Sequence, residues 1–275
     1  MGMNGGGQMR RLILNADDYA LDEEVDAAVL SLASRGIVTA VSAMVLAPRW
    51  MAAAAGLKHE NADCGLHLDL TSRFAAAGSP GAGLAPLVAK AYAGRLAKAK
   101  LRAAIETQLD LFEDAIGRAP AFVDGHQHIH QLPGIRTELL DALDRRYGHG
   151  ARDIGVRICK PRRWRGMKAG VIGALGAERL ARLAVGRGHS TNSDFAGVYG
   201  FAPDTDLSGC WRRWLATLQG EAPLAMCHVA APGRSAADDP IRPARLNEFA
   251  WLASGEFEDL RAEFSVTLTR WPATR

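Results

Sequence analysis

The sequence predicts an α/β fold, a distorted (β/α) barrel in which most strands are parallel. Short apolar runs alternate with helix-prone segments along the chain, which is the pattern of parallel β/α units. The 275 residues suffice for one barrel with a single large core. Polar residues follow several predicted strands, and a parallel barrel brings such positions together at one face. The sequence therefore favours one barrel over two small domains.

The elements are expected in a regular order. Residues 11–15 form an apolar strand that runs directly into Asp17 and Asp18. Asp22 is expected to cap a helix that ends at Gly36. Further strands are expected at 37–46, at 64–70, up to 124, at 153–158, at 222–228 and at a last strand ending near 271. Further helices are expected at 50–57, at 87–116, after 133, at 167–185, at 206–219, at 242–253 and before the last strand.

The domain boundary follows from the first apolar run. Residues 1–10 are Gly-rich and are expected to form a flexible segment, while residues 11–275 are expected to form the single barrel domain. No internal repeat or interdomain linker interrupts this range. No apolar run reaches the roughly 18 residues that would indicate a membrane-spanning helix, so a cytoplasmic location is expected.

Composition excludes several classes of protein. With 48% hydrophobic and 23% charged residues, the chain is neither disordered nor collagen-like nor a coiled coil. The 33 Lys and Arg residues nearly balance the 30 Asp and Glu residues, so total charge gives no strong argument for a nucleic-acid partner. The four cysteines are far apart and form no CxxC pair, which argues against a cysteine zinc site and a dense disulfide framework.

Two adjacent carboxylates, Asp17 and Asp18, stand where a buried strand leaves the core. Adjacent anions at such a position repel each other unless a cation, a proton or hydrogen bonds compensate. A helix-capping turn explains one isolated Asp-Asp pair equally well. Other positions must therefore decide whether the pair belongs to a site.

A second cluster, DGHQHIH at 124–130, places three of the eight histidines within five residues. If this segment is extended, Asp124, His126, His128 and His130 share one face. Successive members then lie about 6.6 Å apart, too far for one metal to take all three histidines. One histidine is expected as a ligand, and the others are expected to line a cleft or to hold ligands in place.

Two further histidines follow or end predicted strands. His67 lies in the alternating segment GLHLDLT, and His228 ends the apolar run LAMCH. Each is weak evidence alone, but in a parallel barrel both would meet Asp17, Asp18 and His126 at the carboxyl ends of the strands. Two imidazoles and one carboxylate are typical ligands of a hydrolytic divalent metal. The other carboxylate would be free to act as a base, and His228 would remain to deliver a proton.

The chain resembles a known family, the YdjC-like carbohydrate deacetylases, which include chitooligosaccharide deacetylases and the hopanoid-associated HpnK branch. The resemblance rests on six segments in order between about residues 11 and 254: LILNADDYA, RGIVTAVSAMV, GLHLDLT, AFVDGHQHIHQLP, AMCH and RLNEFAWLAS. It implies a barrel of the glycoside hydrolase/deacetylase type and metal-dependent removal of an acetyl group from an N-acetylated amino sugar, with release of acetate.

The resemblance also implies roles for individual residues. Asp18, His67 and His126 match the metal ligands, Asp17 the general base and His228 the general acid. Three further residues, expected to be substrate contacts or structural ion pairs, match recurrent family positions: Arg157, Arg245 and Glu248. The chain departs from the family pattern where His228-Val229 replaces His-Pro and where Tyr19-Ala20 replaces Phe-Gly. Imidazole ligands favour Zn²⁺, whereas the family is commonly described with Mg²⁺, so one divalent ion of either kind is expected.

Two basic stretches leave the substrate class open. Residues 90–102 and 160–168 carry several Lys and Arg residues interleaved with apolar ones. They are either solvated faces around the cleft or an amphipathic surface that touches the inner face of a membrane, as would suit lipid-linked N-acetylglucosamine. Alternative functions are a metal-dependent amidohydrolase acting on a non-sugar amide and a non-enzymatic protein that binds an anionic polymer. No nucleic-acid partner is expected, and a homodimer is kept as an expectation.

Overall fold

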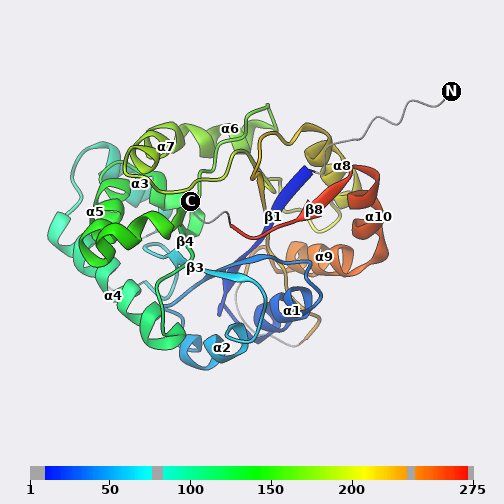
Figure 1. Cartoon of the computed structure of the whole chain (residues 1–275), viewed down its shortest axis with the longest axis horizontal. Coiled ribbons are helices and arrows are strands. Elements are labelled where there is room, and N and C mark those ends of the chain that lie inside the picture. Colours follow the sequence, from blue (N-terminus) through cyan, green and yellow to red (C-terminus); the bar gives the residue numbers. More distant parts are fainter. Residues whose placement is uncertain (1–9, 76–82, 234–238, 272–275) are drawn as a thin grey trace.

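Eight strands, all paired in parallel, form the central sheet of the computed structural model, which describes residues 10–75, 83–233 and 239–271 (Figure 1). Seven of them follow the order β5-β4-β3-β2-β1-β7-β6, and β8 pairs with the first part of β1. The strand bounds are β1 Arg10–Tyr19, β2 Ala40–Ala43, β3 Asp63–Leu68, β4 Phe122–Gly125, β5 Gly155–Val156, β6 Phe195–Ala196, β7 Leu224–Cys227 and β8 Val266–Leu268.

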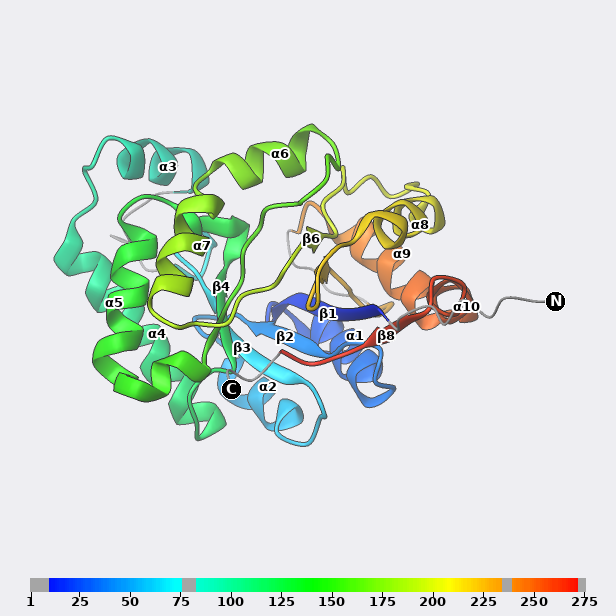
Figure 2. The same ribbon diagram turned by 45° about the horizontal axis from the view of Figure 1, so that its top comes forward.

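Helices connect the strands and cover the outside of the sheet (Figures 1 and 2). Their bounds are α1 Glu23–Ser34, α2 Trp50–Leu57, α3 Leu84–Tyr92, α4 Lys98–Ile116, α5 Ile135–Tyr147, α6 Met167–Ala174, α7 Ala177–Gly186, α8 Leu207–Thr217, α9 Arg242–Ala253 and α10 Gly255–Glu263. Two short 3-10 segments, η1 His126–Gln131 and η2 Gly148–Asp153, lie on either side of α5. Because helices face the sheet from outside, its strands are buried on both faces and read as nearly continuous apolar runs.

The segment before β6 joins the two edges of the sheet. The backbone N–H of Val156 in β5 donates to the carbonyl oxygen of Ser190, and Val156 forms a parallel bridge with Thr191. The chain then runs into β6, which pairs with β7 at the other edge. This arrangement confirms the predicted α/β barrel with parallel strands, distorted because β5 and β6 are only two residues long.

The helix cap predicted at Asp22 is confirmed, since its Oδ1 accepts a hydrogen bond from the Val25 N–H at 2.9 Å. Two other expectations are wrong. The helix expected at 87–116 is two helices, α3 and α4, and the helix expected at 167–185 is α6 and α7. The second break falls at Gly176, whose φ of 116° lies outside the range of a right-handed helix. Strand β6 was not predicted, because two residues are too few to show an alternating pattern.

The remaining expectations concern the ends of the chain and the membrane. The flexible segment expected at residues 1–10 lies outside the described residues except for Arg10, which begins β1. Within the described part of the chain, no helix has the length and apolar character needed to cross a bilayer.

Candidate metal centre

A bulge at the end of β1 explains how two consecutive carboxylates reach one site. Ala16 pairs with Val41 and Tyr19 pairs with Ala43, so β1 contains one more residue than β2 between these pairs. Asp18 has a φ of 67°, a left-handed conformation that is uncommon for residues other than glycine. Adjacent side chains of a regular strand point to opposite faces, and the bulge removes this restriction.

Asp18 lies between two histidines from neighbouring strands. Its Oδ1 is 3.3 Å from Nε2 of His67 on β3 and 3.0 Å from Nδ1 of His126, the first residue after β4. One ligand atom from each of these three residues lies within 4.8 Å of the other two. Two imidazole nitrogens and a carboxylate oxygen at such separations can hold a divalent metal and leave positions open for water and substrate.

Asp124, from β4, fixes the orientation of His67. Nδ1–H of His67 donates to Asp124 Oδ1 at 2.6 Å, which leaves Nε2 directed at Asp18. The other Asp124 oxygen accepts from the Ser42 hydroxyl at 2.6 Å and lies 3.0 Å from Arg157 Nη1. A carboxylate on the far nitrogen of a histidine is the usual partner of a metal-binding imidazole.

Arg157 and Arg245 pair with the two carboxylates of β1. Nη1 and Nη2 of Arg157 donate to the two Asp17 oxygens at 2.6 and 2.7 Å. Nη2 of Arg245 donates to Asp18 Oδ2 at 2.7 Å, and its Nε donates to Asp239 at 2.6 Å. Burial disfavours the ionised carboxyl groups, but Arg157 holds the pKa of Asp17 well below its usual range, and Arg245 does the same for Asp18.

The buried site contains more carboxylates than guanidinium groups: Asp17, Asp18 and Asp124 against Arg157 and Arg245. The excess negative charge acts on the nearest group that can take a proton, His67. Burial opposes protonation of this imidazole, but Asp124 and Asp18 overcome the effect and raise its pKa to about 10. A divalent cation at Nε2 would satisfy the same excess charge, so the residues present fit a metal ion.

His228 follows β7 on the other side of the carboxylate pair. Its Nε2 lies 3.9 Å from Asp17 Oδ2 and 4.0 Å from Asp18 Oδ2. Burial lowers its pKa to about 4. The Phe201 ring packs edge-on against the imidazole with 5.1 Å between ring centroids. His228 therefore lies where it can reach the same reacting group as Asp17.

Glu248, from α9, supports the backbone of His228. The His228 N–H donates to Glu248 Oε2 at 3.1 Å, and the Tyr199 hydroxyl donates to Oε1 at 2.7 Å. Tyr199 also packs on Phe201, with 4.4 Å between ring centroids. Glu248 and Tyr199 thus tie α9 and the loop after β6 to the end of β7.

The structure does not place His128 and His130 on a face with His126. Strand β4 ends at Gly125, and Gln127 and His128 have φ values of 53° and 61°, so the chain turns instead of continuing as a strand. His128 Nδ1 lies 3.4 Å from Cys159 Sγ. His130 Nε2 lies 2.9 Å from the carbonyl oxygen of Arg157. His130 therefore supports the residue that holds Asp17, whereas His128 packs against Cys159 and Phe195.

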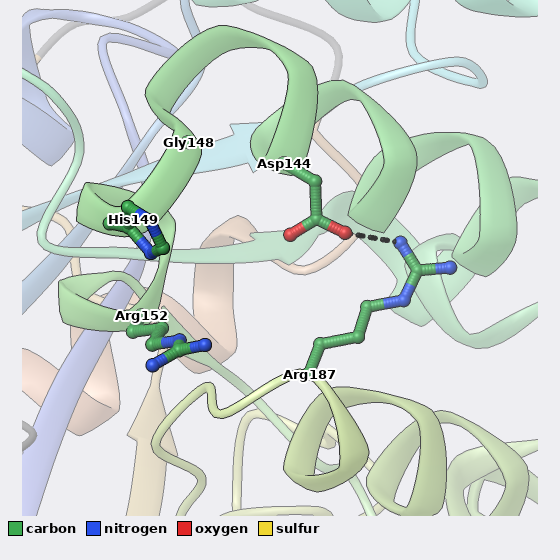
Figure 3. Close-up of a pocket in the computed structure, with 5 residues that line it drawn as sticks. All are labelled: Asp144, Gly148, His149, Arg152 and Arg187. Atoms are coloured by element: carbon green, nitrogen blue, oxygen red, sulfur yellow. Dashed lines mark hydrogen bonds and ion pairs between the residues drawn. The ribbon is translucent and has the colours of Figure 1, made fainter.

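A separate surface hollow of about 370 Å³ lies away from these residues, between α5, η2 and the end of α7 (Figure 3). Its charged lining residues include Arg187, which pairs with Asp144 at 2.7 Å and with Asp141 at 2.8 Å. These two acids neutralise Arg187.

Comparison with known families identifies the chain. Residues 11–263 match the family described as YdjC-like protein, a range that includes all the site residues named above. The chain belongs to the YdjC-like family. The resemblance found in the sequence is thereby confirmed.

Named relatives of this YdjC-like chain include two kinds of deacetylase. The protein named carbohydrate deacetylase is 31% identical over 192 residues in Homo sapiens and 29% identical over 191 residues in Mus musculus, 64% of this chain in each case. A chitooligosaccharide deacetylase of Enterobacter sp. (strain 638) is 29% identical over 131 residues, 45% of this chain. The matches cover 58%, 60% and 52% of those relatives, so the chain spans less than two thirds of their length.

Solved structures share the fold of this YdjC-like chain. A protein of Enterococcus faecalis V583, described as a candidate cellobiose-phosphate cleavage protein, superposes with a TM-score of 0.70 at 18% identity, over 96% of this chain and 98% of that chain. A peptidoglycan N-acetylglucosamine deacetylase superposes with a TM-score of 0.50 at 12% identity, over 96% of this chain and 87% of that chain. At these identities the likeness establishes the fold alone.

Some residues that organise the site were not predicted from the sequence. Asn15 donates to Asp17 at 2.6 Å and to Ser42 at 2.8 Å. Asn15 and Ser42 are isolated polar residues within apolar strands. Asn15 also lies two residues before Asp17, so the alternation of side chains could have indicated these two residues. Tyr199 and Asp239 lie in irregular segments and gave no such signal.

The departure at Tyr19-Ala20 leaves the carboxylates in place. The Tyr19 hydroxyl donates to the carbonyl oxygen of Ala53 at 2.7 Å, away from the Asp18 side chain. Ala20 has a φ of 75°, a conformation that glycine adopts without steric cost. The backbone thus keeps a geometry suited to glycine although alanine occupies the position.

Replacing Glu248 by glutamine is expected to change how stability depends on pH. Burial raises the pKa of Glu248 to about 8, from 4.5, despite hydrogen bonds from Tyr199 and His228 and the nearby charge of Arg245; Asp17 raises it further. The folded protein therefore keeps a proton that the unfolded chain releases. The contribution of Glu248 to the free energy of unfolding is therefore fully present below about pH 4.5 and is lost as pH rises through about 8. Between these values the free energy of unfolding falls by up to about 1.4 kcal/mol per pH unit.

The Glu248→Gln variant should gain stability relative to the unchanged protein as pH rises from 5 to 9, which urea unfolding at several pH values would measure. Glutamine keeps the size of the protonated acid, and its carbonyl oxygen can still accept from the His228 N–H. Glu138→Gln is the matched control, since Glu138 is buried and pairs with Arg102. Parallel pH profiles for Glu248→Gln and the unchanged protein would contradict the raised pKa.

Proposed function

We propose that the protein is a metal-dependent N-deacetylase that removes an acetyl group from an N-acetylated amino sugar and releases acetate. One observation carries the proposal: Asp18, His67 and His126 converge with ligand atoms within 4.8 Å, beside the second carboxylate Asp17. Membership of the YdjC-like family and relatives named carbohydrate and chitooligosaccharide deacetylase support the sugar substrate.

The residues that would hold the metal are Asp18, His67 and His126. The metal when bound would polarise the acetamide carbonyl and lower the pKa of a coordinated water. Two imidazoles among three ligands favour Zn²⁺ over Mg²⁺, and Mg²⁺ is the alternative. Asp124 would keep His67 in the tautomer that presents Nε2.

The chain's own groups would carry the proton transfers. Asp17, held through both oxygens by Arg157, would accept a proton from the attacking water. His228 Nε2, 3.9 Å from Asp17 Oδ2, would take this proton from Asp17 and deliver it to the departing amine. Glu248 would keep His228 at this position through the backbone N–H. Arg245 would hold Asp18 in place through Oδ2 while Oδ1 remains directed at the histidines.

The proposal is tested by acetate release from N-acetylglucosamine oligomers, lipid-linked N-acetylglucosamine and a non-sugar acetamide. We expect release from at least one amino-sugar substrate, loss of release after chelation, and recovery on adding Zn²⁺ or Mg²⁺. Release from the non-sugar amide alone would favour a general amidohydrolase. No release from any substrate by protein with verified metal content would overturn the deacetylase proposal.

A pair of histidine variants tests the metal ligands independently of activity. His126→Gln is expected to weaken metal binding by more than about 10- to 100-fold, the loss that follows removal of a ligand's hydrogen-bonding partner alone. His128→Gln changes the same residue type two positions away and should retain the metal, since His128 contacts Cys159 instead. Isothermal titration with Zn²⁺ measures both. Equal affinity in the two variants would contradict the ligand assignment.

We propose a cytoplasmic location. All four cysteines, which lie in the described part of the chain, are free and buried, as expected in a reducing compartment. If the protein contacts the inner face of the membrane, a lipid-linked sugar would be within its reach. If it does not, the substrate would be a soluble sugar.

A further inference from the structure

Three apolar side chains are exposed close together on α6 and the loop before it. Trp164, Met167 and Val171 are 77%, 76% and 56% exposed. Across the described ranges, six large apolar side chains are strongly exposed, and half of them lie within these eight residues. Such a concentration on an otherwise polar surface indicates a contact with something outside the chain.

The three side chains form one face. Met167 and Val171 are four residues apart on α6, so they lie on the same side of the helix. The Trp164 ring lies across Gly170, where an added Cβ would meet the ring at 2.9 Å. Gly170 lies three residues after Met167 and next to Val171, so the ring lies beside both side chains. Helix α6 itself lies at the outer margin of the molecule (Figure 2).

Cationic residues line a cavity that adjoins this face at Trp164. A cavity of about 540 Å³ lies between the loop, α6 and α7, and Trp164 is one of its lining residues. Its five cationic lining residues are Lys160, Arg162, Arg163, Arg179 and Arg182. The single acidic residue of the lining, Glu178, pairs with Lys160 and lies 3.8 Å from Arg182. The cavity is therefore strongly positive and suits phosphate groups.

The other basic stretch lacks an apolar face. Lys98 and Lys100 at the start of α4 are exposed, and Tyr92 is the one large apolar side chain strongly exposed near them in the described residues. Arg102 in the same stretch pairs with Glu138. Positive charge is thus present in both stretches, whereas charge combined with a continuous apolar face occurs at α6.

We propose that the α6 surface, formed by Trp164, Met167, Val171 and the cationic lining of the cavity, docks the protein on an anionic lipid bilayer. Apolar side chains would enter the boundary between headgroups and acyl chains, and tryptophan favours this depth. The arginines would attract anionic headgroups, and the cavity would accept a lipid phosphate. A bilayer supplies both the apolar layer and the dense negative charge that this surface matches.

The α6 surface adjoins the candidate catalytic site. Lys168 Nζ donates to the carbonyl oxygen of Tyr199 at 3.1 Å and lies 4.1 Å from the centre of the Phe201 ring. Phe201 in turn packs against His228. A docked bilayer would therefore lie beside the wall of the site that carries His228, where an amino sugar held at a membrane surface could enter.

Tryptophan fluorescence tests the proposal directly. The other five tryptophans, which also lie in described parts of the chain, are at most 9% exposed, so a change on adding vesicles reports Trp164. With phosphatidylcholine vesicles that contain phosphatidylglycerol, we expect co-sedimentation and a blue shift, both weakened by salt. Vesicles of phosphatidylcholine alone should bind weakly. Trp164→Phe should abolish the blue shift and retain co-sedimentation.

Charge variants test whether vesicle binding depends on the α6 surface or on positive charge anywhere on the protein. Arg179→Gln with Arg182→Gln should weaken vesicle binding by about 30-fold, the factor for two cationic side chains near an anionic surface. Lys98→Gln with Lys100→Gln removes the same charge from α4 and should leave binding within about threefold of the unchanged protein, if docking is local. Circular dichroism checks that both variants are folded.

Three outcomes would overturn the proposal: no binding to anionic vesicles, equal loss in the α4 variant, or a Trp164 shift in vesicle-free protein that accompanies dimer formation. The last would assign the surface to a second copy of the chain. Vesicle binding does not require catalysis, so its failure would leave the deacetylase proposal intact, and acetate release from a soluble substrate tests that proposal separately.

Discussion

Replacing Arg157 by methionine is expected to lower the free energy of unfolding by about 3–5 kcal/mol, the usual cost of removing one partner from a buried ionic network. Arg157 is fully buried and donates to both oxygens of Asp17, and its Nη1 lies 3.0 Å from Asp124. Methionine fills much of the same space but carries no charge. Two buried carboxylates would then lose their cationic partner, while the apolar packing would change little.

Urea unfolding of chelator-treated protein at neutral pH measures this loss. The matched background is Asp17→Asn with Asp124→Asn, in which no carboxylate depends on Arg157. There the Arg157→Met change should cost much less, so that the double-mutant cycle gives a coupling energy of the order of 1–3 kcal/mol. Equal losses in both backgrounds would show that Arg157 stabilises the fold through packing instead.

The network around Arg157 shows what the sequence could and could not predict. Arg157 was singled out through the family resemblance, as a match to a recurrent family position. That Arg157 contacts Asp17 and Asp124, from β1 and β4, depends on strand order in the sheet. Strand order follows from long-range pairing, which local apolar patterns do not specify. The choice between substrate contact and structural ion pair could therefore not be made from the sequence.

The polar groups at strand ends were the most predictable part of the site. Asp17, Asp18, His67 and His228 each follow or end an apolar run, and the structure brings their side chains within a few ångströms of one another. The apolar pattern did not reveal the bulge that turns both Asp17 and Asp18 toward His228. An extra residue in one strand can be recognised only when the strand is compared with the neighbouring strand that it pairs with.

The histidine cluster shows why alternation alone misled. Alternation assumes that a strand continues, and β4 stops at Gly125. The chain folds back there so closely that a Cβ on Gly125 would lie 3.1 Å from the His130 backbone nitrogen. Glycine just before the first histidine was the available signal for this turn. His126 still reaches Asp18 because it is the first residue after the strand.

Replacing Asp17 by asparagine is expected to lower kcat for acetate release by about 10²- to 10⁴-fold, the range for loss of a general base. Asparagine keeps the size of the side chain and can still accept a hydrogen bond from Arg157 through its carbonyl oxygen, but it does not take a proton from water. Metal affinity should remain, because Asp17 is not among the three clustered residues Asp18, His67 and His126. KM should change little, since the proposed partner of Asp17 is water and not the sugar.

The matched control is Asp194→Asn. Asp194 is also buried and also accepts from both Nη atoms of one arginine, Arg165, at 2.7 and 2.8 Å. It precedes β6 and its carbonyl oxygen accepts from the N–H of Leu224, so it lies at the amino ends of β6 and β7, whereas Asp17 lies at the carboxyl end of β1. Full activity in Asp17→Asn with metal bound would refute its role as the base. Equal losses of kcat in both variants would instead attribute the effect to breaking a buried Asp–Arg pair. A loss of kcat confined to Asp17→Asn would show that proton transfer, and not the pairing with Arg157, is what the variant removes. Both variants weaken a buried Asp–Arg pair, but only Asp17→Asn removes a base beside the candidate metal ligands.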